Sequence, residues 1–203
     1  MQVAFTLGAA FQLRPPRAPY GEGMSVYRNV LAGLIGGAVG TLAMGQYWTR
    51  VAPLLEGDSG SGGGASEQPK EDKHSISVIG QQHQPGESST AAIGRVAYEK
   101  AEGHAPGRQT RAALSEAVHW GMGVGSGALY GALAGRGNPL KGAAFGVGLW
   151  ALVDEGIVPL LGLQDGPAGT PAKGHANRLG AHLSYGLALG VTALLLGALL
   201  PED

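Results

Sequence analysis

The 203-residue chain contains no cysteine. It therefore has no disulfide, no thiolate metal site and no thiol nucleophile, and cysteine usage leaves its redox compartment open. Charged residues are also scarce, at 14% of the chain compared with roughly 25% in ordinary soluble domains. The net charge is only −1 and no Lys/Arg cluster is present, so we expect no nucleic-acid partner and no basic patch dedicated to lipid headgroups.

Familiar catalytic and nucleotide-binding motifs are missing as well. No serine-hydrolase elbow is present, and Ser126 and Ser184 are more typical of helix packing than of nucleophiles. The glycines between Gly121 and Gly127 continue an apolar stretch with no strand before it, so they do not form a dinucleotide-binding loop. A soluble Ala/Gly-rich α/β protein is the alternative that this glycine content leaves open.

Four long, glycine-rich apolar stretches dominate the chain. They cover residues 29–48, 114–135, 140–163 and 176–200. A hydrocarbon core about 30 Å thick needs roughly 20 helical residues, and a helix pairs its backbone polar groups internally. About half of the 37 glycines lie in these stretches, where they let helix backbones approach each other. The sequence therefore predicts an all-α, four-span transmembrane bundle, an integral membrane protein with the lipid bilayer as its surroundings.

The N-terminal 28 residues are predicted to be a flexible arm. Residues 1–23 lack a basic n-region and a clear cleavage site, so we expect no cleaved signal peptide, and Met24 begins a more natural opening. Positive charges near the span ends are equal in number on the two sides. Leaving out the long loop, as the positive-inside rule permits, places both termini in the cytoplasm.

A long polar loop, residues 49–113, separates the first two spans. Its centre, residues 57–73, has the composition of a disordered linker. Residues 88–102 are predicted to form a short amphipathic helix that begins at Ser88 or Ser89 and has Ile93, Val96 and Ala97 on one side. A tight hairpin at 136–139 joins the second and third spans, and a Gly/Pro-rich loop at 164–175 joins the third and fourth.

Glycines at intervals of four residues predict the faces through which the spans pack. The expected packing positions are Gly33, Gly37, Gly123, Gly127, Gly186 and Gly190. The pattern also repeats, because Asn29, Gly33 and Gly37 match Asn138, Gly142 and Gly146, while His119, Gly123 and Gly127 match His182, Gly186 and Gly190. Two duplicated hairpins would explain these matches, and chance in a glycine-rich chain is the alternative.

Ionisable residues within the predicted spans are the candidate functional residues. Each costs roughly 2.5–3.5 kcal/mol on insertion scales, so such groups face the bundle interior and find partners. Glu116 and His119 lie one turn apart on the second span. Asp154 and Glu155 lie deep in the third, about 100° apart around the helix, and His182 lies in the fourth.

These five residues are predicted to form one buried polar cluster in the bundle centre. Both histidines lie on small-residue faces, and Pro159 frees a backbone carbonyl near Glu155. We expect Tyr130, Pro159 and Tyr185 to support the cluster. The other histidines, His74, His83, His104 and His175, lie in predicted loops, where solvation explains them.

Three interpretations of the cluster compete. It can be structural, with acid and imidazole as polar glue between helices. It can be a path for protons or ions, which in a bundle of four helices would require a homo-oligomer. It can be a metal site of a membrane enzyme, since Glu116-x-x-His119 is the pair used by di-iron bundles, although those need two such pairs and two further glutamates. The sequence favours a protein that is not an enzyme and needs no metal or cofactor.

Short motifs in the second half of the chain carry a family resemblance. A span end with Pro159 and Gly162, a loop with Pro167 and Pro171, and a helix start at Ala181, His182 and Leu183 follow one another, and His119, Gly127 and Tyr130 mark the second span. Over residues 114–200 the chain resembles the YagU-like family of small bacterial inner-membrane proteins. The resemblance implies a multi-pass protein of the bacterial inner membrane with an acid-stress role, and it assigns no catalytic residues. A protein partner of the long loop is left unidentified.

Overall fold

The computed structural model describes residues 20–56, 75–135 and 137–199. Within these ranges the chain is helical and contains no strand, which confirms the all-α prediction and argues against the α/β alternative. The predicted linker at 57–73 and most of the predicted N-terminal arm lie outside the described residues.

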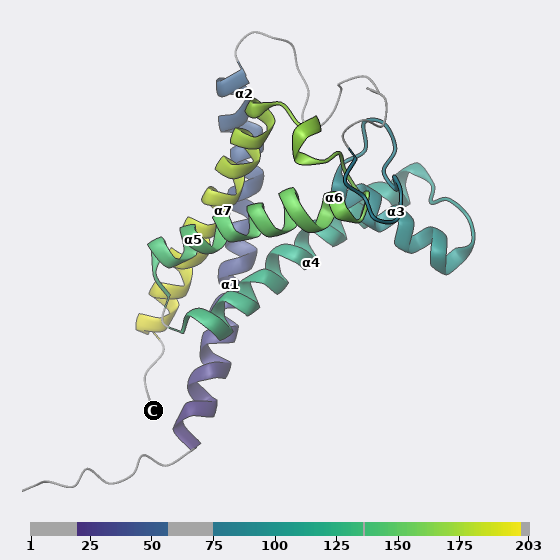
Figure 1. Cartoon of the computed structure of the whole chain (residues 1–203). Coiled ribbons are helices and arrows are strands. Elements are labelled where there is room, and N and C mark those ends of the chain that lie inside the picture. The colour runs from purple at the N-terminus through teal and green to yellow at the C-terminus, as the bar shows by residue number, and fades with distance from the viewer. Residues whose placement is uncertain (1–19, 57–74, 136, 200–203) are drawn as a thin grey trace, which may run out of the picture.

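The helices form four long rods and one short cap helix (Figure 1). The first rod is α1 (Tyr20–Gln46), the π-helical η1 (Tyr47–Val51) and α2 (Ala52–Glu56), and the second is α4 (Arg108–Ala134). The third consists of α5 (Pro139–Leu149), the π-helical η2 (Trp150–Ile157) and α6 (Val158–Leu160), and the fourth is α7 (Ala172–Leu199). The cap helix is α3 (Ser89–Glu102), and the short 3-10 turn η3 (Pro167–Gly169) precedes α7.

Three of the four rods are long and apolar enough to cross a membrane: Val26–Leu55, Pro139–Leu160 and Ala172–Leu199. These helices are consistent with an integral membrane protein. The predicted second span, residues 114–135, lies in α4, which is not among the three, so the four-span prediction is not confirmed. Glu116, His119 and the many glycines of α4 lower its hydropathy, and one side of its first turns packs on α3.

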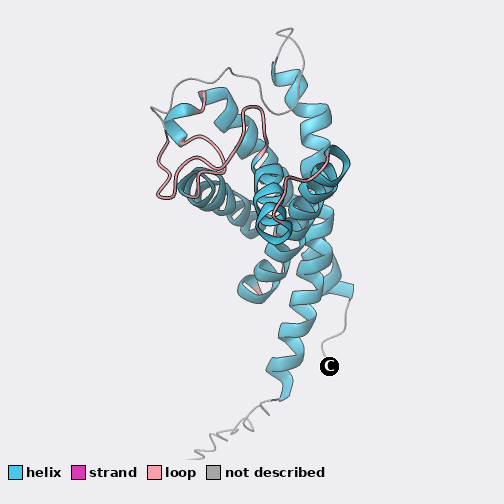
Figure 2. Cartoon of the chain, turned by 90° about the vertical axis from the view of Figure 1, so that its right-hand side faces the viewer, coloured by secondary structure: helices cyan, strands magenta, loops and turns pink. Residues whose placement is uncertain are grey.

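Figure 2 shows long helices that cross one another, and glycines make two of these crossings close. In the first, α1 crosses α4: a Cβ on Gly33 would overlap the carbonyl oxygen of Gly127, and one on Gly37 would lie 2.6 Å from that of Gly123. In the second, α5 crosses α7, and a Cβ on Gly142 would overlap the carbonyl oxygen of Gly186. No other residue type lets two helix backbones approach so closely.

The two crossings have the same internal arrangement, but the glycines of α7 correspond to glycines of α4 one turn away from the predicted ones. Gly131 packs on the carbonyl of Asn29, and Gly190 packs on the carbonyl of Asn138. Asn29 and Asn138 therefore correspond, as the sequence pattern indicates, but Gly190 corresponds to Gly131 and not to Gly127. A stripe with a glycine every four residues matches itself after a shift of one turn, and only the contacts fix the register.

Large side chains fill the space where the two crossings meet. Tyr130, Tyr185 and Leu189 are at most 2% exposed, and the Tyr185 hydroxyl donates to the carbonyl oxygen of Gly123 at 2.6 Å. Tyr130 stacks on Phe145 from α5 with a centroid separation of 5.4 Å. These contacts join the first crossing to the second.

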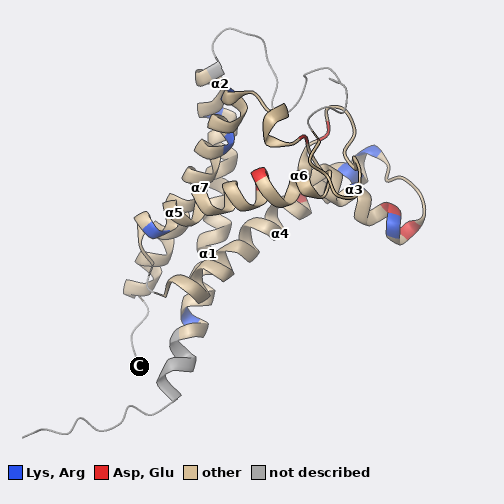
Figure 3. Cartoon of the chain, viewed as in Figure 1, with Lys and Arg blue, Asp and Glu red and all other residues tan. Residues whose placement is uncertain are grey.

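The cap helix α3 begins after Ser88, whose hydroxyl accepts a hydrogen bond from Ala91 N–H at 3.3 Å. Its apolar side packs on α6 and η2 through Ala92, Ile93 and Val96, whereas Ala97, expected on this side, is exposed. Charged residues gather around α3 and at the ends of the rods, and the acidic pair of η2 interrupts an otherwise uncharged stretch (Figure 3). The cap is therefore a polar assembly at one end of an apolar bundle.

Candidate functional site

The shortest acid–imidazole contact of the bundle joins η2 to the first turn of α7. Glu155 Oε1 lies 2.8 Å from His175 Nδ1, and His175 Nε2 lies 3.0 Å from the carbonyl oxygen of Pro167. Because that carbonyl can only accept, Nε2 must carry a proton. One further proton lies in the bond between Glu155 and His175, on the oxygen or on the nitrogen. The pair is therefore either an ion pair or two neutral partners, and both states keep the two hydrogen bonds.

A second, looser pair lies two turns further along α7. His182 Nδ1 is 3.0 Å from the carbonyl oxygen of Arg178 and 3.8 Å from Asp154 Oδ2. The adjacent acids Asp154 and Glu155 were expected to point apart, yet both reach α7. They do so because His175 and His182 share one face of α7, about 10 Å apart along its axis.

The π-helical turn explains how the site is stabilised locally. In a π-helix each N–H bonds to the carbonyl five residues earlier, so the residue at 159 would serve the Asp154 carbonyl. Pro159 has no N–H and leaves that carbonyl without its helical partner. The side-chain amide of Gln164 donates to it instead. The carbonyl that Pro159 was predicted to leave unbonded near Glu155 is thus that of Asp154, and Gln164, which lies beyond the helix, donates a hydrogen bond to it.

Two of the five predicted cluster residues do not join the others. Glu116 is exposed and His119 is partly buried on α4, and within the described ranges no hydrogen bond or ion pair connects either to η2 or α7. The reason is tertiary: the first half of α4 packs on α3 and the second half on α1, away from the acids of η2. The site is thus a set of two acid–imidazole pairs between η2 and α7, and Glu116 and His119 are separate from it.

Two histidines that the sequence assigned to solvated loops make specific contacts. His175 lies in α7 and binds Glu155, as described above; its spacing of seven residues from His182, which puts both on one helix face, could have revealed this. His83 is 12% exposed, with Nδ1 2.9 Å from the carbonyl oxygen of Gly162 and Nε2 3.3 Å from Asp165 Oδ1. The contacts of His83 could not be predicted from the sequence around it, because its partners lie about 80 residues away.

The donor set does not favour a metal centre. Among the described residues, no three His, Asp or Glu side chains lie together in a way that could hold a metal ion. Each imidazole of the site has one carboxylate near it, and the Glu116-x-x-His119 pair has no second pair facing it. Catalytic zinc sites use three protein ligands and di-iron bundles more.

Of the three predicted supporting residues, Pro159 adjoins the site, and the two tyrosines pack at the helix crossings. Pro159 is fully buried at the end of η2. Tyr185 lies one turn beyond His182 on α7, and Tyr130 contacts the α4–α5 connection through a hydrogen bond of 3.1 Å from its hydroxyl to the Asn138 carbonyl. Both tyrosine hydroxyls donate to backbone carbonyls, which fixes their rings at the crossings.

Comparison with known proteins adds no function. No family model, curated protein or solved structure matches the chain. The geometry of the site therefore carries the functional argument alone.

A separate buried ion pair stabilises the cap. Arg95 is 5% exposed; its Nε and Nη2 donate to the two oxygens of Glu87, each at 2.9 Å, and its Nη1 donates to Glu99 at 3.0 Å. Burial alone would raise the pKa of Glu87, but hydrogen bonds from Arg95 and the Gln84 N–H, with the charges of Arg95 and Arg111, outweigh it and lower the pKa. The hydrogen bond that Arg95 donates to Glu87 is the main reason that the pKa of Arg95 is raised despite burial. Both groups therefore stay charged at neutral pH.

Proposed function

We propose that the chain is a four-span protein of the bacterial cytoplasmic membrane, with both termini in the cytoplasm, and that it has a structural, stress-related role rather than an enzymatic one. In this role the acid–imidazole pairs of η2 and α7 hold two spans together. The resemblance to the YagU-like family belongs to the same proposal. α4, the least apolar rod, is the second span.

The hydrogen bond between Glu155 and His175 carries the proposal. This bond joins the third span to the fourth, and the other ring nitrogen of His175, Nε2, bonds to the connecting segment at the Pro167 carbonyl. Polar contacts of this kind between membrane helices contribute about 0.6–2 kcal/mol each. The pair therefore stabilises the junction between the two spans.

The short extent of the site along α7 favours a structural role over a proton path. The two pairs cover about 10 Å along α7, whereas the hydrocarbon core is about 30 Å thick. Beyond them α7 meets α5 and α1 through glycine and tyrosine contacts, which leave no further titratable pair among the described residues. Proton or ion permeation remains the second candidate, and it would need a homo-oligomer that supplies the rest of the path.

A double-mutant cycle tests the structural role. Glu155→Gln, His175→Ala and the double variant are purified in detergent, and their free energies of unfolding are measured at pH 7.5. We expect a coupling energy of about 0.6–2 kcal/mol between the two positions. Glu116→Gln combined with His175→Ala serves as the control and should show additive effects, because Glu116 makes no contact with the site. Additive effects for Glu155 and His175 would contradict the structural role.

Flux measurements separate the two candidate functions. Wild type and Glu155→Gln are reconstituted into liposomes, and the external pH is stepped from about 7.5 to 5, around the ordinary pKa of histidine. The structural role predicts tight vesicles with both proteins. A pH-activated proton flux that Glu155→Gln abolishes would establish permeation instead.

A further inference from the structure

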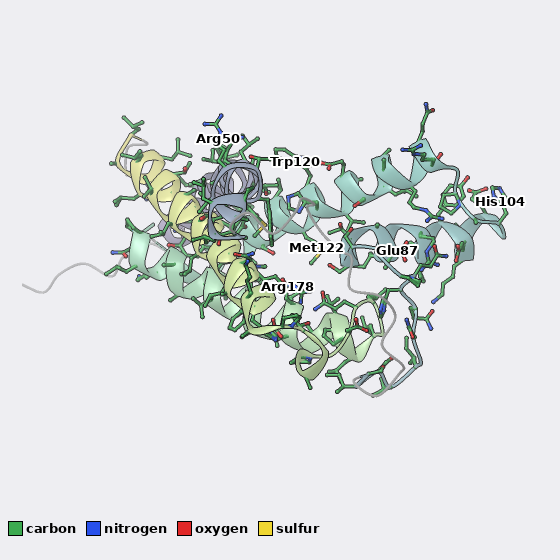
Figure 4. The ribbon with its side chains drawn as sticks, turned by 90° about the horizontal axis from the view of Figure 1, so that it is seen from above. Arg50, Glu87, His104, Trp120, Met122 and Arg178 are labelled. Atoms are coloured by element: carbon green, nitrogen blue, oxygen red, sulfur yellow. The ribbon has the colours of Figure 1, made fainter. Side chains whose placement is uncertain are left out.

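A surface pocket lies in the cap, apart from the acid–imidazole pairs. Its volume is about 420 Å³, and it is lined by the turn before α3, by the first turns of α3 and by Arg111 of α4. Figure 4 shows Glu87 beside α3, well separated from Arg178 on α7. The pocket therefore belongs to neither the bundle core nor the site proposed above.

Arg111 is the one pocket residue with a charge that the cap does not neutralise through a bond. Its Nη1 makes a long hydrogen bond of 3.3 Å to Gln84 Oε1, and its Nε is buried without an acceptor. No ion pair to Arg111 occurs within the described part of the chain. The Nε N–H is buried, so a ligand in the pocket would meet the terminal Nη1 and Nη2 groups, of which only Nη1 has an acceptor among the described residues.

The only carboxylate of the pocket is already occupied. Both oxygens of Glu87 accept from Arg95, and Oε2 also accepts from Gln84 N–H at 2.9 Å. Glu87 therefore has few sites left for a ligand cation. The remaining hydrogen-bonding capacity of the pocket lies on the guanidinium of Arg111 and on the side-chain amide of Gln84, because the Ser88 hydroxyl is bonded to Ala91 N–H and to Thr90.

The position of Arg111 along α4 matches the depth of lipid phosphates. In the proposed placement α4 is the second span, and Gly127, near the middle of residues 114–135, marks the bilayer centre. Arg111 is sixteen residues earlier, about 24 Å along the axis. A tilt of about 40° reduces this to about 18 Å of depth, just outside a hydrocarbon half-thickness of about 15 Å.

We propose that this pocket binds a phosphate group through Arg111, supplied either by a phospholipid headgroup or by free phosphate. The guanidinium fork matches two phosphate oxygens, and the side-chain amide of Gln84 provides a further donor. The depth argument rests on the membrane placement proposed above, whereas the pocket chemistry does not. Membrane integration is therefore checked separately, by resistance of the protein to carbonate extraction.

The test compares thermal unfolding in an uncharged maltoside detergent with three probes: dihexanoyl phosphatidylglycerol, inorganic phosphate and dihexanoyl glycerol. We expect the phospholipid to raise the unfolding temperature of wild type and of Arg108→Gln in a saturable way, and dihexanoyl glycerol to have no effect. In Arg111→Gln the apparent affinity should fall about tenfold or more. Arg108 is the matched control because it is exposed, one turn away on the same helix, and does not line the pocket.

The outcomes are distinct. If inorganic phosphate reproduces the effect at similar concentrations, the site is one for free phosphate. If only the phospholipid acts, the site is one for a headgroup. Should Arg111→Gln fail to fold, Ala91→Leu fills the same pocket and should abolish the response. A response in Arg111→Gln or Ala91→Leu equal to that of wild type would overturn the proposal, even if carbonate extraction confirms membrane integration.

Discussion

Replacing Gly127 with alanine tests the glycine crossing of α1 and α4. A Cβ at this position would overlap the carbonyl oxygen of Gly33 and would lie 2.6 Å from Gly37 Cα and 2.8 Å from Gly37 N. All three are backbone atoms, so no side chain can rotate away. To restore ordinary contact distances the two helices must separate by about 1 Å at the crossing, which weakens the packing on both sides of it.

The size of the effect follows from this geometry. Overpacking a rigid contact costs about 1–3 kcal/mol. The gain in helix propensity from glycine to alanine, up to about 1 kcal/mol, offsets part of that cost. The control is Gly125→Ala, two residues away on the same helix, where an added Cβ meets nothing within 4 Å. It carries the same gain in propensity without the clash, so Gly127→Ala should be about 1–3 kcal/mol less stable than Gly125→Ala.

The assay is unfolding in mixed micelles of detergent and SDS, followed by the fluorescence of the three tryptophans. Gly186→Ala, at the corresponding position of the second crossing, should behave like Gly127→Ala because its Cβ would overlap the Gly142 carbonyl. Equal stability of Gly127→Ala and Gly125→Ala would refute the crossing and, with it, the packing of α1 on α4.

Three further predictions concern single contacts. Tyr185→Phe removes the hydroxyl bond to the Gly123 carbonyl and should cost about 0.5–1.5 kcal/mol in the same unfolding assay. The pKa of Glu87 is lowered in the folded protein, so its charge stabilises the cap at pH values above the unfolded pKa of about 4.3, and this stabilisation should be lost as the pH falls through the lower folded pKa. Hydrogen exchange of residues 82–95, corrected for intrinsic rates, should therefore rise below about pH 4 in wild type. In Glu87→Gln the exchange should be raised at all pH values. His83→Ala should increase exchange at Gln82 N–H, which bonds to the Gly162 carbonyl at 2.8 Å, whereas His104→Ala, at an exposed turn, should leave it unchanged.

Much of the helix content could be predicted from local sequence. Long apolar stretches predicted the rods, and Ser88 predicted the start of α3. The extent of the rods was less accessible: the first continues through a π-helical turn to Glu56, beyond the predicted end at residue 48.

The candidate site was predicted in part. Asp154, Glu155 and His182 lie in one region, as expected from the cost of isolated charges in an apolar helix. Glu116 could not be excluded from sequence, since its one-turn spacing from His119 resembles that of a ligand pair. His175 was missed because it lies one residue before the predicted start of the fourth span, whereas α7 begins at Ala172. His83 was missed because its partners are distant in the chain.

The sequence by itself determined that this protein is helical, rich in close helix contacts, and built around rods long enough for a membrane, because apolar length and glycine content are local properties. Only the tertiary structure decided which glycines meet, in which register, and which acid faces which histidine. A stripe that repeats every four residues is compatible with several registers, and each acid has more than one histidine within helical reach. The choice among them depends on the packing of all four rods at once.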